Sequence, residues 1–117
     1  YIFTMPNRKS IAWLAGEIKT PPFSERARQE SGFLLGRLQD GVTLAMPHAR
    51  PMPSIGPGCP AFRVKDARAE WRIFCRIDPD AVIVLHVFSK KTAKTPVTVL
   101  DQCKARLARY DRESKGA

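Results

Sequence analysis

The residues best able to do chemistry are cations that alternate along two apolar segments in the second half of the chain. Successive side chains of a strand point to opposite faces of a sheet, so FRVK and EWRIFCRI would separate their cations from their apolar residues. The cations of the shared face are Arg63, Lys65, Arg72 and Arg76. Phe74 lies within this basic row and could stack on a nucleobase. Lysines that follow the next apolar segment extend the row: Lys90, Lys91 and Lys94.

This basic row predicts contact with a polyanion. Cations that face each other across neighbouring strands repel and weaken the pairing, so a face that concentrates them favours a bound anion. Phosphate is the natural anion, and the row has the character of an RNA cradle. The alternative is that the cations are ordinary solvent-facing side chains of an antiparallel sheet.

The net charge points the same way. Lys and Arg number 20 against 11 Asp and Glu, which gives a formal charge of +9. Residues 62–117 carry 13 basic and 7 acidic side chains, whereas residues 1–61 carry 7 and 4. The second half is therefore the expected contact surface, although a basic surface can also serve solubility alone.

The other residues with chemical potential are few. His48 lies in a proline-rich segment and could transfer protons near neutral pH or contact RNA, whereas His86 lies in an apolar run and is expected to be a core histidine. No carboxylate cluster accompanies these two histidines, so neither a metal site nor a cofactor is expected. Ser54, Ser89 and the cysteines lack the G-x-S-x-G and Cys/His signatures of covalent catalysis.

Length and composition predict one folded domain. The 117 residues are 44% hydrophobic and 26% charged, and we expect a single domain over 1–117 with flexible ends at 1–9 and 113–117. Cys59, Cys75 and Cys103 form no C-x-x-C pair, so reduced thiols are expected. Neither a membrane span nor a signal peptide is recognisable, and these features together predict a cytoplasmic protein.

The elements of the first half are a strand and a helix followed by a long loop. SIAWLA at 10–15 predicts a strand, and helical spacing predicts a helix over 25–40 with Ser24 as N-cap and Gly41 as its stop. Residues 42–61 contain five prolines, which predicts a stiffened loop without any regular element.

The second half predicts three strands and a closing helix. The strands at 62–65, 70–77 and 82–88 have short connections and should form an antiparallel meander, with 82–88 covered on both faces. Pro96 suits the first position of an amphipathic helix. The outer face of that helix is predicted to carry Lys104, Arg106, Arg109 and Arg112. The predicted fold is α+β: a small antiparallel sheet, with the meander and the N-terminal strand, packed against two helices.

This order of elements, with several quoted segments, resembles the RelE/HigB toxin superfamily and in particular its phage-derived HigB-like branch. The segments are FRVK, EWRIFCRID, VIVLHVFSKKTAKTP and the loop MPHARPMPSIGPGC, followed by the basic helix. The resemblance covers nearly all of residues 10–112. It implies a RelE-like fold and the toxin of a type II toxin–antitoxin system.

The resemblance also implies partners and site residues. Such toxins are ribosome-dependent mRNA endonucleases that act in the ribosomal A site and inhibit translation, and a cognate helix-turn-helix DNA-binding antitoxin holds them inactive. The family places its catalytic cations at two alternate positions of one strand, on the next strand, and just after the central strand. The matching positions here are Arg63, Lys65, Arg72 and Lys91. The remaining cations and the aromatic of the row, Arg76, Phe74, Lys90 and Lys94, are then expected to bind RNA.

The implied reaction is metal-independent attack of a ribose 2′-hydroxyl on the adjacent phosphate, which needs a base and cations that stabilise the phosphorane. Some relatives supply a Tyr or His after the central strand, where this chain has Pro96 and Val97. Lys65 or His48 is the candidate base in their place.

Two other functions remain open at this point. Related toxins share the fold but poison DNA gyrase without cleaving RNA, and a basic sheet can also be a plain RNA-binding module. The basic row favours RNA over gyrase. Ribosome-dependent cleavage separates these possibilities, because a gyrase poison leaves cleaved DNA complexes instead.

Overall fold

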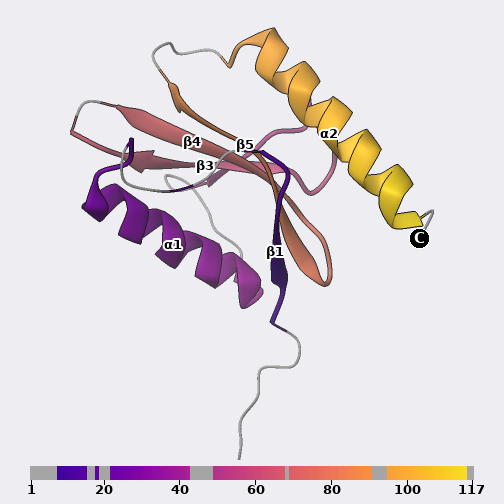
Figure 1. Cartoon of the computed structure of the whole chain (residues 1–117), viewed down its shortest axis with the longest axis horizontal. Helices are drawn as coiled ribbons and strands as arrows, with labels where there is room; N and C mark the ends of the chain where they lie inside the picture. The colour runs from indigo at the N-terminus through magenta and orange to yellow at the C-terminus, as the bar shows by residue number, and fades with distance from the viewer. Residues whose placement is uncertain are drawn as a thin grey trace, which may run out of the picture.

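A five-stranded sheet lies between two helices in the computed structural model of the chain (Figure 1). The structure describes residues 8–15, 18, 22–42, 49–67, 69–90 and 95–115. In chain order the elements are β1 (Ser10–Trp13), α1 (Glu25–Gln39), β2 (Ala49–Pro51), β3 (Pro60–Lys65), β4 (Glu70–Ile77), β5 (Ala81–Lys90) and α2 (Val97–Lys115). The strand order is β1-β5-β4-β3-β2. The predicted α+β class is confirmed.

Helix α1 begins and ends where local signals predict. The Ser24 side chain accepts a hydrogen bond from the Ala27 N–H at 3.0 Å, which caps the first turn. At the other end Gly41 has a φ of 84°, and its N–H donates to Leu38 while the N–H of Val42 donates to Arg37. These two bonds form a Schellman motif, which needs a left-handed residue and so favours glycine.

Strands β3, β4 and β5 form the predicted antiparallel meander. Arg63 lies directly opposite Arg72, and Phe74 lies opposite His86. Between Phe74 and Cys75 the register shifts by one residue, so Leu85 is the extra residue of β5. The shift places both Leu85 and His86 on the face that α2 covers.

Two strand pairings differ from the prediction. β1 pairs with β5 in parallel, which makes the sheet mixed. The segment predicted as a loop without regular structure contains β2, which pairs with the start of β3. Its prolines are tolerated because β2 is an edge strand and because Pro51 and Pro60 face each other in the register. The neighbouring Met52 N–H donates to the Cys59 carbonyl. The nitrogens of Pro51 and Pro60, which carry no hydrogen, therefore point away from the partner strand, and no hydrogen bond of the ladder is lost.

The core is divided into two layers by the sheet. On one side Phe62, Val64, Trp71, Ile73 and Cys75 pack against α1, and the Trp71 ring stacks on Phe23 with a centroid distance of 4.0 Å. On the other side residues of β4 and β5 pack against α2 through Val99, Cys103 and Leu107. In the interior strand β5, residues 81–85 are buried and residues 86–89 are only partly buried, so the predicted cover on both faces is confirmed for the first part of 82–88.

Helix α2 starts one residue later than predicted and presents one cation inward. Pro96 precedes the helix and its carbonyl accepts from the Leu100 N–H at 3.3 Å. Arg106, which the sequence placed on the outer face, reaches the sheet instead, because its guanidinium caps a carbonyl of β5. The helix continues to Lys115, beyond the predicted start of a flexible end at 113. Neither helix of the described chain is long and apolar enough to cross a membrane.

Candidate active site

Three of the predicted catalytic cations meet at one end of the sheet. Arg63 and Arg72 are direct partners across β3 and β4, and Lys65 is the partner of Glu70 in the same ladder. Period-two alternation places these four side chains on one face, the face that carries α2 further along the sheet. We call Arg63, Lys65, Glu70 and Arg72 the Arg–Glu cluster.

Glu70 is the acceptor that both arginines share. Its Oε1 lies 3.5 Å from Nη1 of Arg63, and its Oε2 lies 3.2 Å from Nη2 and 3.4 Å from Nε of Arg72. The sequence pattern E-x-R on a strand puts the two side chains on one face, so alternation could have located Glu70. It was missed because only cations were sorted by face. The protein's own carboxylate therefore occupies a place that the sequence reasoning gave to phosphate.

Arg72 differs from its prediction in exposure. It was expected to face solvent or RNA, but the residue is only 7% exposed. Burial is tolerated because its guanidinium donates twice to the Glu70 carboxylate. Arg63 and Glu70 remain more accessible, with side chains 33% and 28% exposed. Thus the cluster presents Arg63 and Lys65 outward, and Arg72 behind them.

A groove of about 640 Å³ borders the cluster. Residues of β3, of the β3–β4 turn and of the first turns of α1 line it: Ser24, Arg26, Glu30, Arg63, Lys65, Asp66 and Ala67. β2 pairs only with the first half of β3, so Arg63 and Lys65 lie beyond the paired stretch. Because α1 covers the opposite face of the sheet, the groove lies along this unpaired half of β3, and Glu70 and Arg72 are not among the residues that line it.

Asp66 holds the two walls of this groove together. Its Oδ2 accepts from the backbone N–H of Ser24 at 3.0 Å and from Nε1 of Trp71 at 3.2 Å, and its Oδ1 accepts from the Ala67 N–H. The bond from the Ser24 N–H is the main cause that lowers the Asp66 pKa from 3.8 to about 2. The carboxylate thereby ties the β3–β4 turn to the start of α1.

The other end of the basic row has a structural role in this fold. Phe74, proposed as a stacking surface, is completely buried in the layer beneath α2 and cannot reach a base in this conformation. Arg76, proposed to bind RNA, is held by two carboxylates, Asp78 beside it and Asp111 on α2, at 2.7–3.0 Å. The alternation sorted the faces correctly, but it does not reveal which part of a face a helix will cover.

The remaining predicted residues are described in part or not at all. Lys90 is the last residue of β5 and lies opposite Glu70 in the register, but its side chain is outside the described atoms. His48, Lys91 and Lys94 lie outside the described residues, so their predicted roles stay predictions.

His86 is fixed by α2. Its Nδ1 lies 2.7 Å from Nη1 of Arg106, which also donates to the Leu85 carbonyl at 2.8 Å. A guanidinium can only donate, so Nδ1 is the acceptor and the ring hydrogen is on Nε2. Burial, and then the charge of Arg106, lowers the His86 pKa and keeps the ring neutral. The predicted satisfied histidine is thus observed, half-buried.

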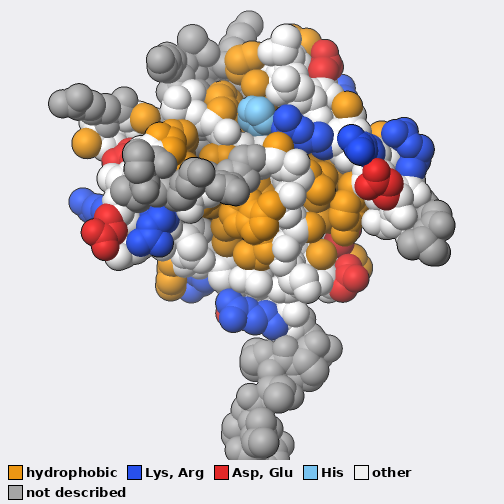
Figure 2. All heavy atoms as spheres, in the orientation of Figure 1, with side chains coloured by type: hydrophobic (Ala, Val, Ile, Leu, Met, Phe, Trp, Pro, Cys, Tyr) orange, Lys and Arg blue, Asp and Glu red, His pale blue; other side chains and the backbone are white. Residues whose placement is uncertain are grey.

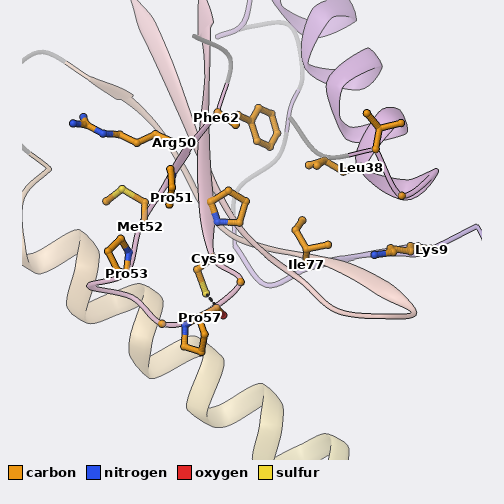
Figure 3. Close-up of a pocket in the computed structure, with 16 residues that line it drawn as sticks. Lys9, Leu38, Arg50, Pro51, Met52, Pro53, Pro57, Cys59, Phe62 and Ile77 are labelled. Atoms are coloured by element: carbon orange, nitrogen blue, oxygen red, sulfur yellow. Dashed lines mark hydrogen bonds between the residues drawn. The ribbon is translucent and has the colours of Figure 1, made fainter. Parts of the chain in front are cut away.

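A larger pocket of about 700 Å³ lies elsewhere, beside the edge strand β2 and the turn that follows it (Figure 3). Leu38, Phe62 and Ile77 contribute apolar walls, and Lys9 and Arg50 are its cations. Cys59 lines it as well, but its Sγ contacts the Pro57 carbonyl at 3.6 Å and burial raises its thiol pKa. Among the described residues that line this pocket we find neither an activated nucleophile nor a base, and we place the chemistry at the cluster.

The surface is not basic all round. On the face shown in Figure 2, hydrophobic side chains occupy the centre, and Lys and Arg side chains lie in separate groups around it. In the part of the chain that the structure describes, no group of three or more His, Cys, Asp or Glu side chains could hold a metal ion. All three cysteines are free and buried.

Fold and cluster define a small basic α+β protein in which two arginines, a lysine and a glutamate gather at one end of the sheet. The family model described as "Phage derived protein Gp49-like (DUF891)" matches residues 21–108. The chain therefore belongs to the phage-derived Gp49-like family, which confirms the phage-derived part of the resemblance noted from sequence. Comparison with curated proteins and with solved structures gave no match.

Proposed function

We propose that this chain is the toxin of a type II toxin–antitoxin pair, of the RelE/HigB kind, and that it cleaves mRNA on the ribosome. The observation that carries the proposal is the facing pair Arg63 and Arg72, with Lys65 beside them on the groove. Two guanidinium groups can each present parallel donors to phosphate oxygens, and such donors stabilise a phosphorane. Membership in the Gp49-like family and the +9 charge support the same function.

The proposed reaction needs no metal. A ribose 2′-hydroxyl attacks the adjacent phosphorus, and the arginines stabilise the charge that develops on the phosphate oxygens. The groove supplies charge but little that would orient a flexible RNA. We therefore expect the ribosome to position the message, so that cleavage depends on translating ribosomes.

The test is cleavage of a defined message in a purified translation system, with and without ribosomes, by the wild type and by variants at Arg72. Arg72→Lys keeps the charge but loses the bidentate geometry, so activity should fall, and Arg72→Ala should lose more. Loss of one preorganised donor removes about 2.7–4 kcal/mol of transition-state stabilisation, or roughly a hundredfold or more in rate.

The control is Arg109→Ala, because the Arg109 side chain is 75% exposed and pairs only within α2. Arg72 is buried, so thermal melts must show that each variant is folded at the assay temperature. Full activity of folded Arg72→Ala would remove the cluster from the catalytic site. Cleaved gyrase–DNA complexes without RNA cleavage would establish the gyrase poison instead, and RNA binding without cleavage would establish a binding module.

We further propose that the cognate antitoxin neutralises the chain by covering the Arg–Glu cluster with acidic residues. Such an interface is electrostatic, so its affinity should fall steeply as salt rises from about 0.05 to 0.5 M, given a Debye length near 10 Å at 0.1 M. Titration calorimetry at several salt concentrations measures this. An affinity that does not change with salt would indicate an apolar interface.

A further inference from the structure

We propose that Glu70 is the general base of this site and accepts the proton of the attacking ribose 2′-hydroxyl. The inference rests on the proposed RNA cleavage and adds the group that the cations cannot provide. In the protonated state in which they bind phosphate, Arg and Lys side chains only donate, which argues against Lys65 as the base, whereas an ionised carboxylate only accepts. Glu70 is the one carboxylate of the Arg–Glu cluster, and its side chain is 28% exposed.

The position of Glu70 suits a base. It starts β4 and faces Lys65 on one neighbouring strand and Lys90 on the other. Each carboxylate oxygen contacts a different arginine, so Glu70 lies between the two guanidinium groups that would grip the scissile phosphate. The 2′-hydroxyl is attached to the ribose carbon next to the one that carries this phosphate. A base beside the phosphate grip can therefore reach the hydroxyl.

The contacts of Glu70 are looser than those of a structural ion pair. Its distances to Arg63 and Arg72 are 3.2–3.5 Å, whereas Arg76 binds Asp78 and Asp111 at 2.7–3.0 Å in the same fold. Charge-assisted N–H···O bonds are strong at about 2.7–2.9 Å and weaken with length. The Arg–Glu bonds can thus be exchanged for bonds to phosphate at a modest cost.

This exchange couples substrate binding to base activation. When a phosphodiester binds, the guanidinium donors turn to its oxygens and release the Glu70 carboxylate, which the strand keeps in place. The released carboxylate oxygens can then accept the proton of the 2′-hydroxyl, so phosphate binding prepares the base.

The 2′-hydroxyl proton moves to Glu70, the 2′-oxygen forms a bond to phosphorus, and the bond between phosphorus and the 5′-oxygen breaks. The leaving 5′-oxygen takes a proton from water, and Glu70 returns its proton to water. The products are a 2′,3′-cyclic phosphate and a 5′-hydroxyl end, with no change of oxidation state.

The decisive variant is Glu70→Gln, which keeps the shape and an acceptor oxygen for the arginines but cannot take the proton. We expect single-turnover cleavage on the ribosome to fall at least a hundredfold, within the 10²–10⁴ range of general-base catalysis. Affinity for the ribosome–message complex should stay equal or increase, because a negative charge is removed. The matched control is Glu113→Gln, since Glu113 is also paired with an arginine but lies exposed on α2.

The pH–rate profile supplies a readout that a purely structural Glu70 would not change. A general base gives the rate an acid limb, so the wild-type profile should show a decline at acid pH that Glu70→Gln lacks. If Glu70→Gln does not fold, Glu70→Asp keeps the base and displaces it, so its rate should fall while its acid limb remains.

Two results would contradict the role of Glu70 as the general base. If Glu70→Gln cleaves as fast as the wild type or faster, Glu70 merely occupies the phosphate position and must be displaced. That result would leave the proposed function intact, because the wild type still cleaves. If the wild type cleaves no RNA on ribosomes, the proposed function fails, and the role of Glu70 fails with it.

Discussion

Arg76 is predicted to stabilise the fold rather than to bind RNA, and the prediction can be tested with Arg76→Ala. Its guanidinium donates from Nε and Nη2 to Asp78 at 2.8 and 3.0 Å, and from Nη1 and Nη2 to Asp111 at 2.9 and 2.7 Å. These bonds raise the Arg76 pKa and join α2 to the end of β4. The variant would remove the guanidinium that Asp78 and Asp111 share.

The magnitude follows from burial. Removal of one partner from a fully buried ion pair costs about 3–5 kcal/mol, because the other charge stays buried. Here the Arg76 side chain is 19% exposed and that of Asp111 is 41% exposed, so the carboxylates can be partly rehydrated. We therefore expect a loss of about 2–3 kcal/mol in the free energy of unfolding. For a domain of this size the midpoint of thermal unfolding should fall by roughly 6–15 °C.

The assay is urea denaturation followed by far-UV circular dichroism at neutral pH, repeated in 1 M salt. Arg109→Ala is the control, because its exposed pair with Glu113 should contribute less than about 1 kcal/mol. Salt should remove most of the small Arg109 effect and little of the Arg76 effect, since buried pairs are poorly screened. At a temperature where both are folded, Arg76→Ala should bind ribosomes with an unchanged salt dependence.

Two results would refute this reasoning. An Arg76→Ala protein no less stable than Arg109→Ala would show that the four hydrogen bonds contribute little. A salt slope reduced by about one unit would show that Arg76 contacts a phosphate, as the sequence suggested.

Two further predictions concern pH. The Asp66 pKa is lowered to about 2, so the hydrogen bonds of its carboxylate stabilise the fold above the unfolded pKa near 3.8, and this stabilisation is lost as pH falls towards 2. Acid unfolding of Asp66→Asn should lack this part of the pH dependence. An unchanged acid transition would contradict the stabilising role of the Asp66 carboxylate. His86 has its pKa lowered below 6.5, so it is neutral in the fold, and stability should decline as pH falls below about 6.5 because the unfolded chain binds the proton more readily. Urea titrations of the wild type and of His86→Gln should differ in this range, and identical curves would show that the burial of His86 is not the source of the decline.

The sequence predicted the elements whose signals are local. Ser24 and Gly41 mark the ends of α1 through bonds to residues within a few positions, so their meaning survives without any knowledge of the fold. Alternation likewise sorted Arg63 and Arg72 onto one face, because the period of a strand is a property of its backbone.

Other features depended on distant parts of the chain. The parallel pairing of β1 with β5 and the short strand β2 arise from partners far away in sequence, for which alternation gives no signal. Arg106 was assigned to the outer face of α2, yet its side chain points inward, because its guanidinium donates to the Leu85 carbonyl and to His86 on β5. The path of α2 across the sheet decided which cations became structural.

The local ratio of cations to carboxylates distinguishes the two ends of the basic row better than the count of cations does. At Arg76 one guanidinium is shared by two carboxylates, so its donors are saturated and a phosphate would gain little. At Glu70 one carboxylate is shared by two guanidinium groups through longer bonds, with Lys65 opposite in the ladder. An additional anion is stabilised only where positive charge exceeds negative charge within a few ångströms. The cation excess around Glu70 on β3 and β4 is therefore the reason to propose that end of the row, rather than the Arg76 end, as the phosphate site.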